Sequence, residues 1–319
     1  MDVVQAPPVL SLTVAEVKEE ADGVVSLRFV ASSGERLPRW APGAHVDLRL
    51  ANGIERQYSL CGDPADHDGW RVGVLREPES RGGSAFIHEQ LSAGDSVVVQ
   101  GPRNNFPLVA ADAYVFVAGG IGITPLLPMI AAADARGAEW QLVYGGRTAA
   151  SMAFTAELAA YGPRVKLWPQ DVHGLIDLDG LLGAPRDGVA VYCCGPEVLI
   201  AAVEERCAAW PAGALHVERF RPRPGALDGA RTAFEVECEY TGITVLVRAD
   251  QSIAQAVESA GIEVATSCRE GTCGTCETVV LEGVPDHRDS FLSSEEREAN
   301  DVMMICCSRA RSERLVLDL

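Results

Sequence analysis

The sequence predicts three successive domains: an antiparallel β-barrel, a doubly wound α/β domain and a compact α+β domain. Two changes of pattern along the chain predict this order. Short strands with alternating apolar and polar residues give way, near Pro107, to continuous apolar runs separated by helical segments. A segment rich in proline and glycine, residues 221–225, then precedes a third region with its own hairpin and helix. A chain of 319 residues also exceeds what one hydrophobic core usually supports.

The first domain, residues 1–107, is expected to be a small antiparallel barrel. Turn signals such as Pro42-Gly43 and Asn52-Gly53 separate its strands at the short intervals that are typical of such barrels. The expected strands are 11–17, 24–30, 45–50, 71–75 and 96–100.

The second domain, residues 108–224, is expected to be a doubly wound parallel sheet. Its apolar runs are continuous, which is typical of strands buried on both faces, and the segments between them suit helices. The expected strands are 114–118, 140–144, 165–168 and 189–193.

The third domain, residues 231–319, is expected to have an α+β fold. Two strands, 234–240 and 244–247, flank the turn signal Thr241-Gly242, and a helix is expected over 252–260, followed by a cysteine-rich loop.

Composition excludes several classes of function. The formal net charge of −18 argues against nucleic acid, because phosphate binding requires clustered Lys and Arg. No apolar run is long enough to span a membrane, and the first thirty residues do not resemble a secretory signal. We therefore expect a cytoplasmic, monomeric protein. Residues 231–319 hold 17 Asp and Glu against 8 Arg and no Lys, a net charge of −9. This acidic region suits docking on a basic partner, or simply keeps the protein soluble.

The ten cysteines are unevenly distributed, which favours metal ligation over a disulfide framework. Cys268, Cys273 and Cys276 have the spacing C-x4-C-x2-C, with a fourth cysteine far downstream, as in plant-type [2Fe–2S] sites. Zinc is the alternative, but it usually takes cysteines in two short pairs. By spacing, Cys306 and Cys307 both qualify as fourth ligand. Neighbours on a strand point to opposite faces, so only one is expected to reach the cluster.

A glycine loop follows the first strand of the second domain. Residues 119–125, Gly-Gly-Ile-Gly-Ile-Thr-Pro, lie between that strand and a helical stretch, an arrangement that binds pyrophosphate. A turn that serves only tight packing is the alternative interpretation. Ligands of such sheets bind at the carboxyl ends of the strands. We therefore expect a dinucleotide to contact these residues: Gly120, Gly122, Thr124, Arg147, Cys194, Gly195 and Pro196. Asp171, after another strand, is expected to bind the adenosine ribose and favour NADH over NADPH.

Two segments of the barrel carry the side chains expected around a flavin. Arginine pairs with phosphate, tyrosine packs against an isoalloxazine ring, and serine hydrogen-bonds the N5 edge of that ring. The segments are Arg56-Gln57-Tyr58-Ser59-Leu60 and Arg81-Gly82-Gly83-Ser84.

Taken together, these motifs resemble the phthalate dioxygenase reductase family, also called class IA oxygenase reductases. The resemblance covers nearly the whole chain and includes the ending Cys306-Cys307-Ser308-Arg309-Ala310, which matches the family's Cys-x-Ser-Arg-Ala. It therefore favours Cys306 as the fourth ligand. It also implies a β-grasp ferredoxin fold for the third domain, and FMN, with Arg56 and residues 82–84 around its phosphate. An aromatic residue lies against the flavin in this family, and Phe220 matches its position.

The resemblance implies an NADH-dependent flavin iron–sulfur oxidoreductase. Electrons would pass from NADH to FMN, then to the [2Fe–2S] cluster, and on to a terminal oxygenase of the Rieske non-haem iron type that acts on an aromatic compound. Ser59, Cys194 and Phe220 are the expected catalytic residues. Two alternatives remain at this point: a haem-thiolate monooxygenase as the electron acceptor, and a redox sensor that oxidises NADH slowly or not at all.

Overall fold

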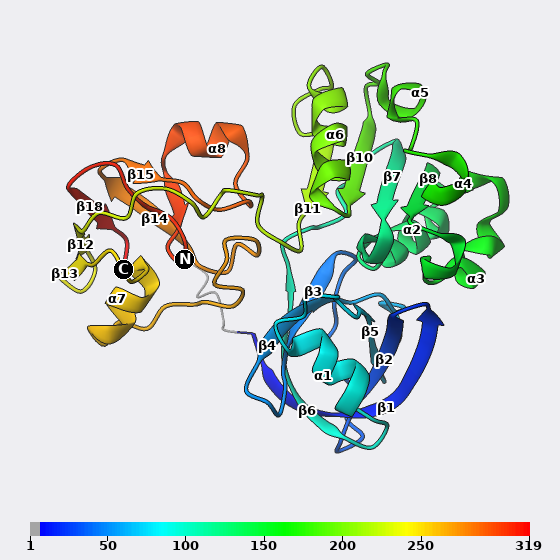
Figure 1. Ribbon diagram of the computed structural model, residues 1–319, viewed down its shortest axis with the longest axis horizontal. Coiled ribbons are helices and arrows are strands. Elements are labelled where there is room, and N and C mark those ends of the chain that lie inside the picture. Colours follow the sequence, from blue (N-terminus) through cyan, green and yellow to red (C-terminus); the bar gives the residue numbers. More distant parts are fainter. Residues whose placement is uncertain (1–6) are drawn as a thin grey trace. The chain divides into compact units, whose positions relative to one another are not determined.

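The computed structural model describes residues 7–319; residues 1–6, with which the first predicted domain begins, lie outside the described residues. The chain forms two compact units, of which the first ends at Glu218 and the second begins at Arg219. In Figure 1 the first unit runs in colour from blue to green, and the second from yellow-green to red.

The first unit begins with a six-stranded antiparallel sheet in the order β4-β3-β6-β1-β2-β5. Its elements are β1 (Val9–Ala21), β2 (Val24–Ala31), β3 (Ala44–Arg49), β4 (Glu55–Ser59), β5 (Trp70–Leu75), α1 (Gly83–Gln90) and β6 (Ser96–Asn104). A bridge between Leu60 and Val72 joins the end of the β4 edge to β5, so the sheet curls into a barrel. Val46, Leu48 and Val99 are fully buried inside it. The predicted barrel is confirmed.

A five-stranded parallel sheet follows, in the order β11-β10-β7-β8-β9. Its strands are β7 (Ala113–Gly119), β8 (Glu139–Gly146), β9 (Val165–Pro169), β10 (Val189–Cys194) and β11 (Leu215–Glu218). The chain therefore reverses its direction of winding between β7 and β10. This is the predicted doubly wound sheet, and its reversal point is where such folds bind ligands.

Helices cover both faces of this sheet (Figure 1). The longer ones are α2 (Leu126–Ala135) and α6 (Glu197–Cys207). The shorter ones are η1 (Gly120–Ile123), η2 (Ala149–Ser151), α3 (Thr155–Leu158), η3 (Ala159–Arg164), α4 (Gln170–His173) and α5 (Leu178–Leu182). Helix α2 packs with Phe116 and Tyr144 on one face, whereas α5 and α6 pack with Val117 and Val191 on the other. Alternate residues of β7 thus enter two different cores, which explains why its sequence is apolar throughout.

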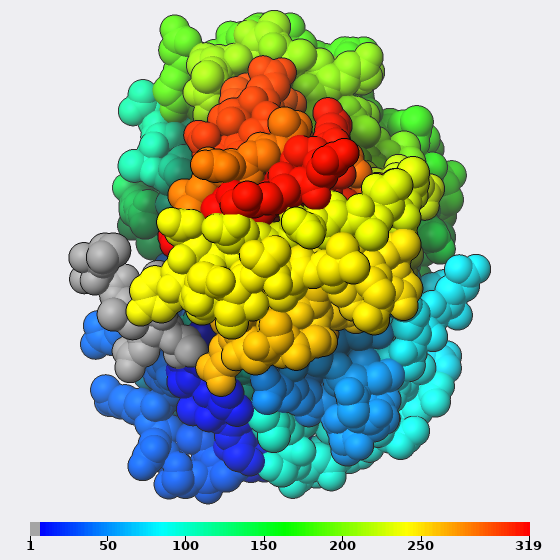
Figure 2. All heavy atoms as spheres, turned by 90° about the vertical axis from the view of Figure 1, so that its left-hand side faces the viewer, coloured from blue at the N-terminus to red at the C-terminus, as the bar shows by residue number. Residues whose placement is uncertain are grey.

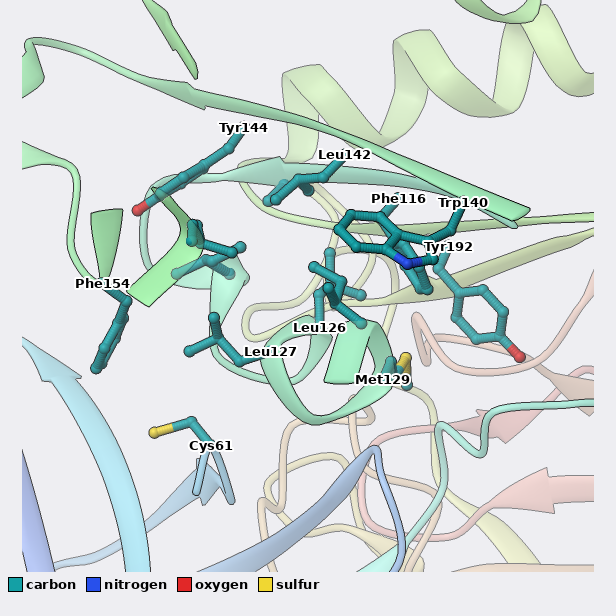
Figure 3. Close-up of a cluster of buried hydrophobic side chains, with 14 of the residues drawn as sticks. Cys61, Phe116, Leu126, Leu127, Met129, Trp140, Leu142, Tyr144, Phe154 and Tyr192 are labelled. Atoms are coloured by element: carbon teal, nitrogen blue, oxygen red, sulfur yellow. The ribbon is translucent and has the colours of Figure 1, made fainter. Parts of the chain in front are cut away.

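The barrel and the parallel sheet share one hydrophobic core. Figure 3 shows Cys61, from the barrel, in the same core as Leu127 of α2 and Phe154. Beside this core, Arg71 of β5 donates two hydrogen bonds to the carboxylate of Glu157, at 2.5 and 2.8 Å. The first unit therefore fixes barrel residues relative to the carboxyl ends of the parallel strands.

The second unit contains a five-stranded mixed sheet in the order β13-β12-β18-β14-β16. Its elements are β12 (Phe234–Cys238), β13 (Ile243–Val247), α7 (Ile253–Ser259), β14 (Glu277–Glu282), β15 (Pro285–Asp286), α8 (Ser294–Ala299), β16 (Val302–Met304), β17 (Arg309–Ala310) and β18 (Arg314–Leu317). The predicted hairpin is β12–β13, and the predicted helix is α7, which Ser252 and Gln255 begin with a capping box. Figure 2 faces this unit, with yellow β12 beside red β18, its parallel partner.

Within residues 7–319, the helices are too short or too polar to cross a lipid bilayer.

Candidate functional site

Two glycine-containing turns meet where the winding of the parallel sheet reverses. A Cβ atom added to Gly122, after β7, would lie 2.3 Å from the carbonyl oxygen of Cys194, at the end of β10. One added to Gly195 would lie 2.9 Å from the Cα of Gly119. The two turns can therefore approach this closely only because both lack side chains. The result is a pair of adjoining backbone turns at the carboxyl edge of the sheet.

The first turn has the local structure of an anion site. Gly120 has a φ of +53°, and η1 begins there, so the chain turns sharply away from β7 into α2. Thr124 is 1% exposed, and its hydroxyl donates to the carbonyl of Ile121 at 2.9 Å. Backbone N–H groups at such a turn are available to pyrophosphate oxygens, so the residues fit the predicted role.

Three polar side chains meet beside these turns. Ser59, at the end of β4 in the barrel, hydrogen-bonds the carboxyl group of Glu218 at the end of β11. The thiol of Cys194 lies 4.0 Å from Glu218 Oε2, because Cys194 and Glu218 are paired in register on β10 and β11. The three residues come from both halves of the first unit. We call Ser59, Cys194 and Glu218 the switch-point group.

Burial keeps two members of the switch-point group uncharged. Glu218 as a residue keeps some contact with water, but the surroundings of its carboxyl group desolvate it and raise its pKa from 4.5 to about 8. Burial also raises the pKa of the Cys194 thiol, as does the neighbouring Glu218. At neutral pH the group can therefore hold a proton on Glu218 and offers a neutral thiol.

Sequence reasoning missed Glu218, although it singled out Ser59 and Cys194. The available signal was its position: Glu218 is the last residue of a strand, two residues before Phe220. That strand, β11, is too short and too little buried to be recognised by apolar pattern. Phe220 itself is the second residue of the second unit and is 43% exposed.

Arg56 lies against the turn that precedes α1. A Cβ atom added to Gly83 would lie 2.7 Å from Arg56 Cγ, and Arg56 Nη2 donates to the carbonyl of Arg81 at 3.4 Å. Gly82 has a φ of +93°, which an L residue rarely adopts. Guanidinium and the first N–H groups of α1 thus meet at one point, as a phosphate group requires.

The other predicted flavin residues are distributed around this turn and on β4. Ser84 is buried at the start of α1, where its hydroxyl contacts Ser80. Tyr58 is partly buried, and burial raises the pKa of its phenol well above the usual value. Leu60 differs, because its side chain belongs to the barrel core and only its backbone can reach a ligand.

Arg147 and Asp171 lie together at the ends of β8 and β9. The amide of Asp171 donates to the carbonyl of Arg147 at 3.1 Å, and both side chains are exposed. The edge that sequence reasoning assigned to the adenosine ribose therefore carries one positive and one negative side chain.

In the second unit, four cysteines from two segments bring their sulfur atoms together. Cys268 hydrogen-bonds Cys273 and Cys306, and Cys276 hydrogen-bonds Cys306. The contact with Cys273, followed by that with Cys306, holds the pKa of the Cys268 thiol well below its usual value. Thiolates are the ligands of iron–sulfur clusters. Among residues 7–319, no group of three or more His, Cys, Asp or Glu side chains is arranged to hold a single metal ion.

The loop that carries three of these cysteines, residues 268–276, fits the predicted cluster. The amides of Glu270 and Thr272 each donate to Cys268 Sγ at 3.4 Å. Gly271 has a φ of +73°, and a Cβ atom there would lie 2.5 Å from Cys307 Sγ. Cys306 contacts Cys268 and Cys276, whereas Cys307 lies beside Gly271 and Cys306.

Comparison with known proteins gives consistent results. Residues 236–311 match the model of the 2Fe-2S iron–sulfur cluster binding domain, which confirms the predicted cluster. The chain is 41% identical to the phenoxybenzoate dioxygenase subunit beta of Ectopseudomonas oleovorans, over 97% of both chains.

Solved structures are similar to the whole chain, and two of them illustrate this. The structure of phthalate dioxygenase reductase, described as modular for electron transfer from pyridine nucleotides to [2Fe–2S], is 35% identical over 98% of both chains, with a TM-score of 0.72. An intact type IV self-sufficient cytochrome P450 monooxygenase is 43% identical, with a TM-score of 0.88. There the match covers 98% of this chain but 41% of that one, so this chain spans less than half of the P450 protein.

Proposed function

This chain belongs to the phthalate dioxygenase reductase family, and we propose that the terminal acceptor of its electrons is an oxygenase of the Rieske non-haem iron type. It is an NADH-dependent oxidoreductase of an oxygenase system, with FMN and a [2Fe–2S] cluster as its cofactors. FMN held by the barrel would supply the chemistry that takes up a hydride and gives out electrons one at a time. The remaining question is what the residues of this chain contribute.

The main support for the proposed site is the hydrogen bond between Ser59 and Glu218. It joins the barrel to the end of β11, next to β10 at the reversal of the parallel sheet, where a flavin ring held by the barrel could meet a nicotinamide held by the sheet. Cys194 is adjacent to Glu218 there. We propose that the switch-point group orients the two rings and excludes water, and that Glu218 is the residue of the group that holds a proton.

The other contacts divide between the two cofactors. Arg56 and the start of α1 bind the FMN phosphate, and Tyr58 packs against the ring. Gly120, Gly122 and Thr124 bind the NADH pyrophosphate. The remaining assigned contacts are Arg81, Gly82, Gly83 and Ser84 for FMN, with Arg147, Asp171, Gly195 and Pro196 for NADH. Phe220 is assigned to the flavin face. Cys268, Cys273, Cys276 and Cys306 hold the cluster.

A cysteine variant tests whether the cluster is on the path to the acceptor. Cys273→Ser removes one ligand, so NADH should still bleach the flavin while electron transfer to a one-electron protein acceptor is lost. Stopped-flow absorbance separates the two steps. Cys307→Ser is the matched control and should keep both, because Cys306 is the neighbour that contacts Cys268 and Cys276. Normal transfer by Cys273→Ser would remove the cluster from the path.

A haem-thiolate monooxygenase is the second candidate acceptor, because the same modules occur within the self-sufficient P450 chain. Measuring electron transfer from the purified reductase to each acceptor in turn decides between the two candidates. Reduction of a haem protein together with failure to support any Rieske oxygenase would overturn the first choice.

The proposal also assigns the setting in which the reductase works. We place it in the cytoplasm, where NADH is available and the cysteines that do not hold the cluster stay reduced. We expect a monomer that docks on the oxygenase through the acidic residues of its second unit. Sedimentation of the purified protein tests the monomer.

A further inference from the structure

A buried carboxylate lies against the loop that carries three of the assigned cluster ligands. Asp289 is 1% exposed, and a Cβ atom added to Gly271 would lie 2.8 Å from Asp289 Cα and 3.0 Å from Asp289 Cβ. The next residue fixes this contact, because the amide of Ser290 donates to the carbonyl of Gly271 at 2.8 Å. Gly271 lies between Cys268 and Cys273 in the sequence. Asp289 is therefore held directly beside the cluster loop.

The hydrogen bonds to this carboxylate converge on one of its two oxygens. The amides of Phe291 and Leu292 donate to Asp289 Oδ2 at 3.0 and 2.8 Å. Arg297 of α8 donates to the same oxygen through Nη2 at 3.1 Å. The other oxygen, Oδ1, is buried and has no hydrogen-bond partner among residues 7–319, and His287 Nδ1 lies 4.0 Å from it. An oxygen that accepts from three N–H donors is typical of a carboxylate that carries its charge.

The positive partner of this carboxylate is fixed in place but is less buried. Arg297 also donates to the carbonyls of Asp289 and Leu292, at 2.6 and 3.1 Å. The three heavy atoms nearest to the Cβ position of Gly271 are Cys307 Sγ, Asp289 Cα and Asp289 Cβ, so Arg297 lies farther from this point of the loop. The Arg297 side chain is 25% exposed, whereas that of Asp289 is fully buried. Because water screens the exposed charge more than the buried one, the pair presents a net negative charge to the cluster loop.

A fixed negative charge beside a [2Fe–2S] cluster opposes its reduction, since reduction adds one more negative charge. Net charge, hydrogen bonds to the sulfurs and exposure to water together set the potential of such clusters. We propose that Asp289 lowers the reduction potential of the cluster, which makes the cluster a stronger donor to the electron acceptor, and that Arg297 limits this effect. The inference rests on the proposed cluster ligands and on the proposed path from cluster to acceptor.

The test compares the reduction potential of the holoprotein with that of the variant Asp289→Asn. Asparagine keeps an oxygen that can accept from the amides of Phe291 and Leu292, and it removes the charge. We expect the equilibrium constant for one-electron reduction of the cluster to rise about tenfold, which is an upward shift of about 59 mV. Redox titration followed by EPR of the reduced cluster measures this shift, with no acceptor protein present.

Variants of Arg297 test the sign of the effect. Arg297→Gln leaves the carboxylate without its positive partner, so the equilibrium constant for reduction should fall severalfold, opposite to Asp289→Asn. Arg297→Lys keeps the positive charge and should restore a potential close to that of wild type. A role confined to holding the loop would disturb the cluster in the same way in both neutral variants and would not reverse the sign of the shift.

Asp250 provides a matched control in the second unit. It pairs with Arg248 at 3.3 Å, but the side chains of Asp250 and Arg248 are 76% and 66% exposed. Asp250→Asn removes the same charge as Asp289→Asn and should leave the potential unchanged, because water screens an exposed pair.

Each outcome supports or overturns a definite part of the argument. A potential of Asp289→Asn equal to or below that of wild type would overturn the inference, as would an equal rise in Asp250→Asn. If Asp289→Asn holds no cluster, Arg297→Gln decides, and a potential equal to or above that of wild type would then overturn it. Wild-type protein without the EPR signal of a reduced cluster would instead contradict the proposed ligands. Wild type with the expected potentials that fails to reduce a Rieske oxygenase would contradict only the proposed acceptor.

Discussion

Glu218 is a carboxyl group whose surroundings oppose its ionisation. The hydroxyl of Ser59 lowers its pKa, but desolvation acts more strongly in the opposite direction. The resulting pKa of about 8 is close to neutral pH, and a group that holds or passes a proton is most useful when its pKa is near the working pH. A carboxyl group of ordinary pKa at this position would place a full negative charge beside the hydride path that we propose.

The raised pKa of Glu218 predicts how the stability of the first unit depends on pH. The folded chain binds the Glu218 proton more tightly than the unfolded chain does. Stability therefore falls as pH rises from about 4.5 to about 8, and is level on either side of that range. We expect this residue to cost about 2 kcal/mol over the range, less than the full shift because the side chain keeps some contact with water.

Glu218→Gln should remove this part of the pH dependence, because glutamine does not titrate. Urea unfolding of wild type and variant at pH 5, 7 and 9 measures the difference. All five tryptophans lie before residue 219, so their fluorescence reports on the first unit alone. Parallel pH profiles for the two proteins would contradict the assigned pKa.

At the scale of elements, the ends of β7 and β10 are held together by the absence of side chains. This predicts different costs for two glycine substitutions in one turn. Gly122→Ala would place a methyl group 2.3 Å from Cys194 O, and we expect a loss of about 3 kcal/mol from overpacking. A Cβ atom on Gly120 would have no neighbour within 4 Å, so Gly120→Ala should cost only the strain of its positive φ, about 1 kcal/mol of stability. Unfolding followed by tryptophan fluorescence measures the stability of both variants. Equal losses of stability would show that the two turns can move apart freely.

Elements with a clear periodic pattern could be predicted from the sequence, and the others could not. Alternation revealed most strands of the barrel, and continuous apolar runs revealed β7 to β10. Strand β4 escaped because four of its five residues are only partly buried, so it has no alternation. Helix α1 begins with glycine and has no side-chain cap, which removes the usual start signal.

At the scale of the whole molecule, cofactor identity was easier to predict than geometry. The spacing of the cysteines alone indicated the iron–sulfur cluster, because three cysteines in one short loop with this spacing are typical of few other sites. The resemblance drawn from the combined motifs is confirmed by relatives that match along the whole chain. The pairing of Ser59 with Glu218 was not accessible, because residues far apart in sequence meet there only after the sheet has formed.

The charge of the second unit predicts how the reductase meets its oxygenase. Residues 231–319 of this unit carry a net charge of −9, which should attract a basic docking surface, and at 0.1 M salt such attraction is largely screened beyond about 10 Å. We therefore expect the KM for the oxygenase to rise severalfold between 20 and 200 mM salt. Reduction of ferricyanide should change little, because a small acceptor needs no docking surface.

Charge reversal can show whether the acids of the second unit, rather than the net charge of the protein, are responsible. Glu295 and Glu298 are exposed on α8, and neither is the Glu296 that caps this helix. Glu295→Lys combined with Glu298→Lys should raise the KM at low salt severalfold and flatten its salt dependence. Glu35→Lys with Asp187→Lys makes the same change of charge on exposed residues of the first unit and should leave both unchanged. Equal effects of the two double variants would mean that these acids only keep the protein in solution.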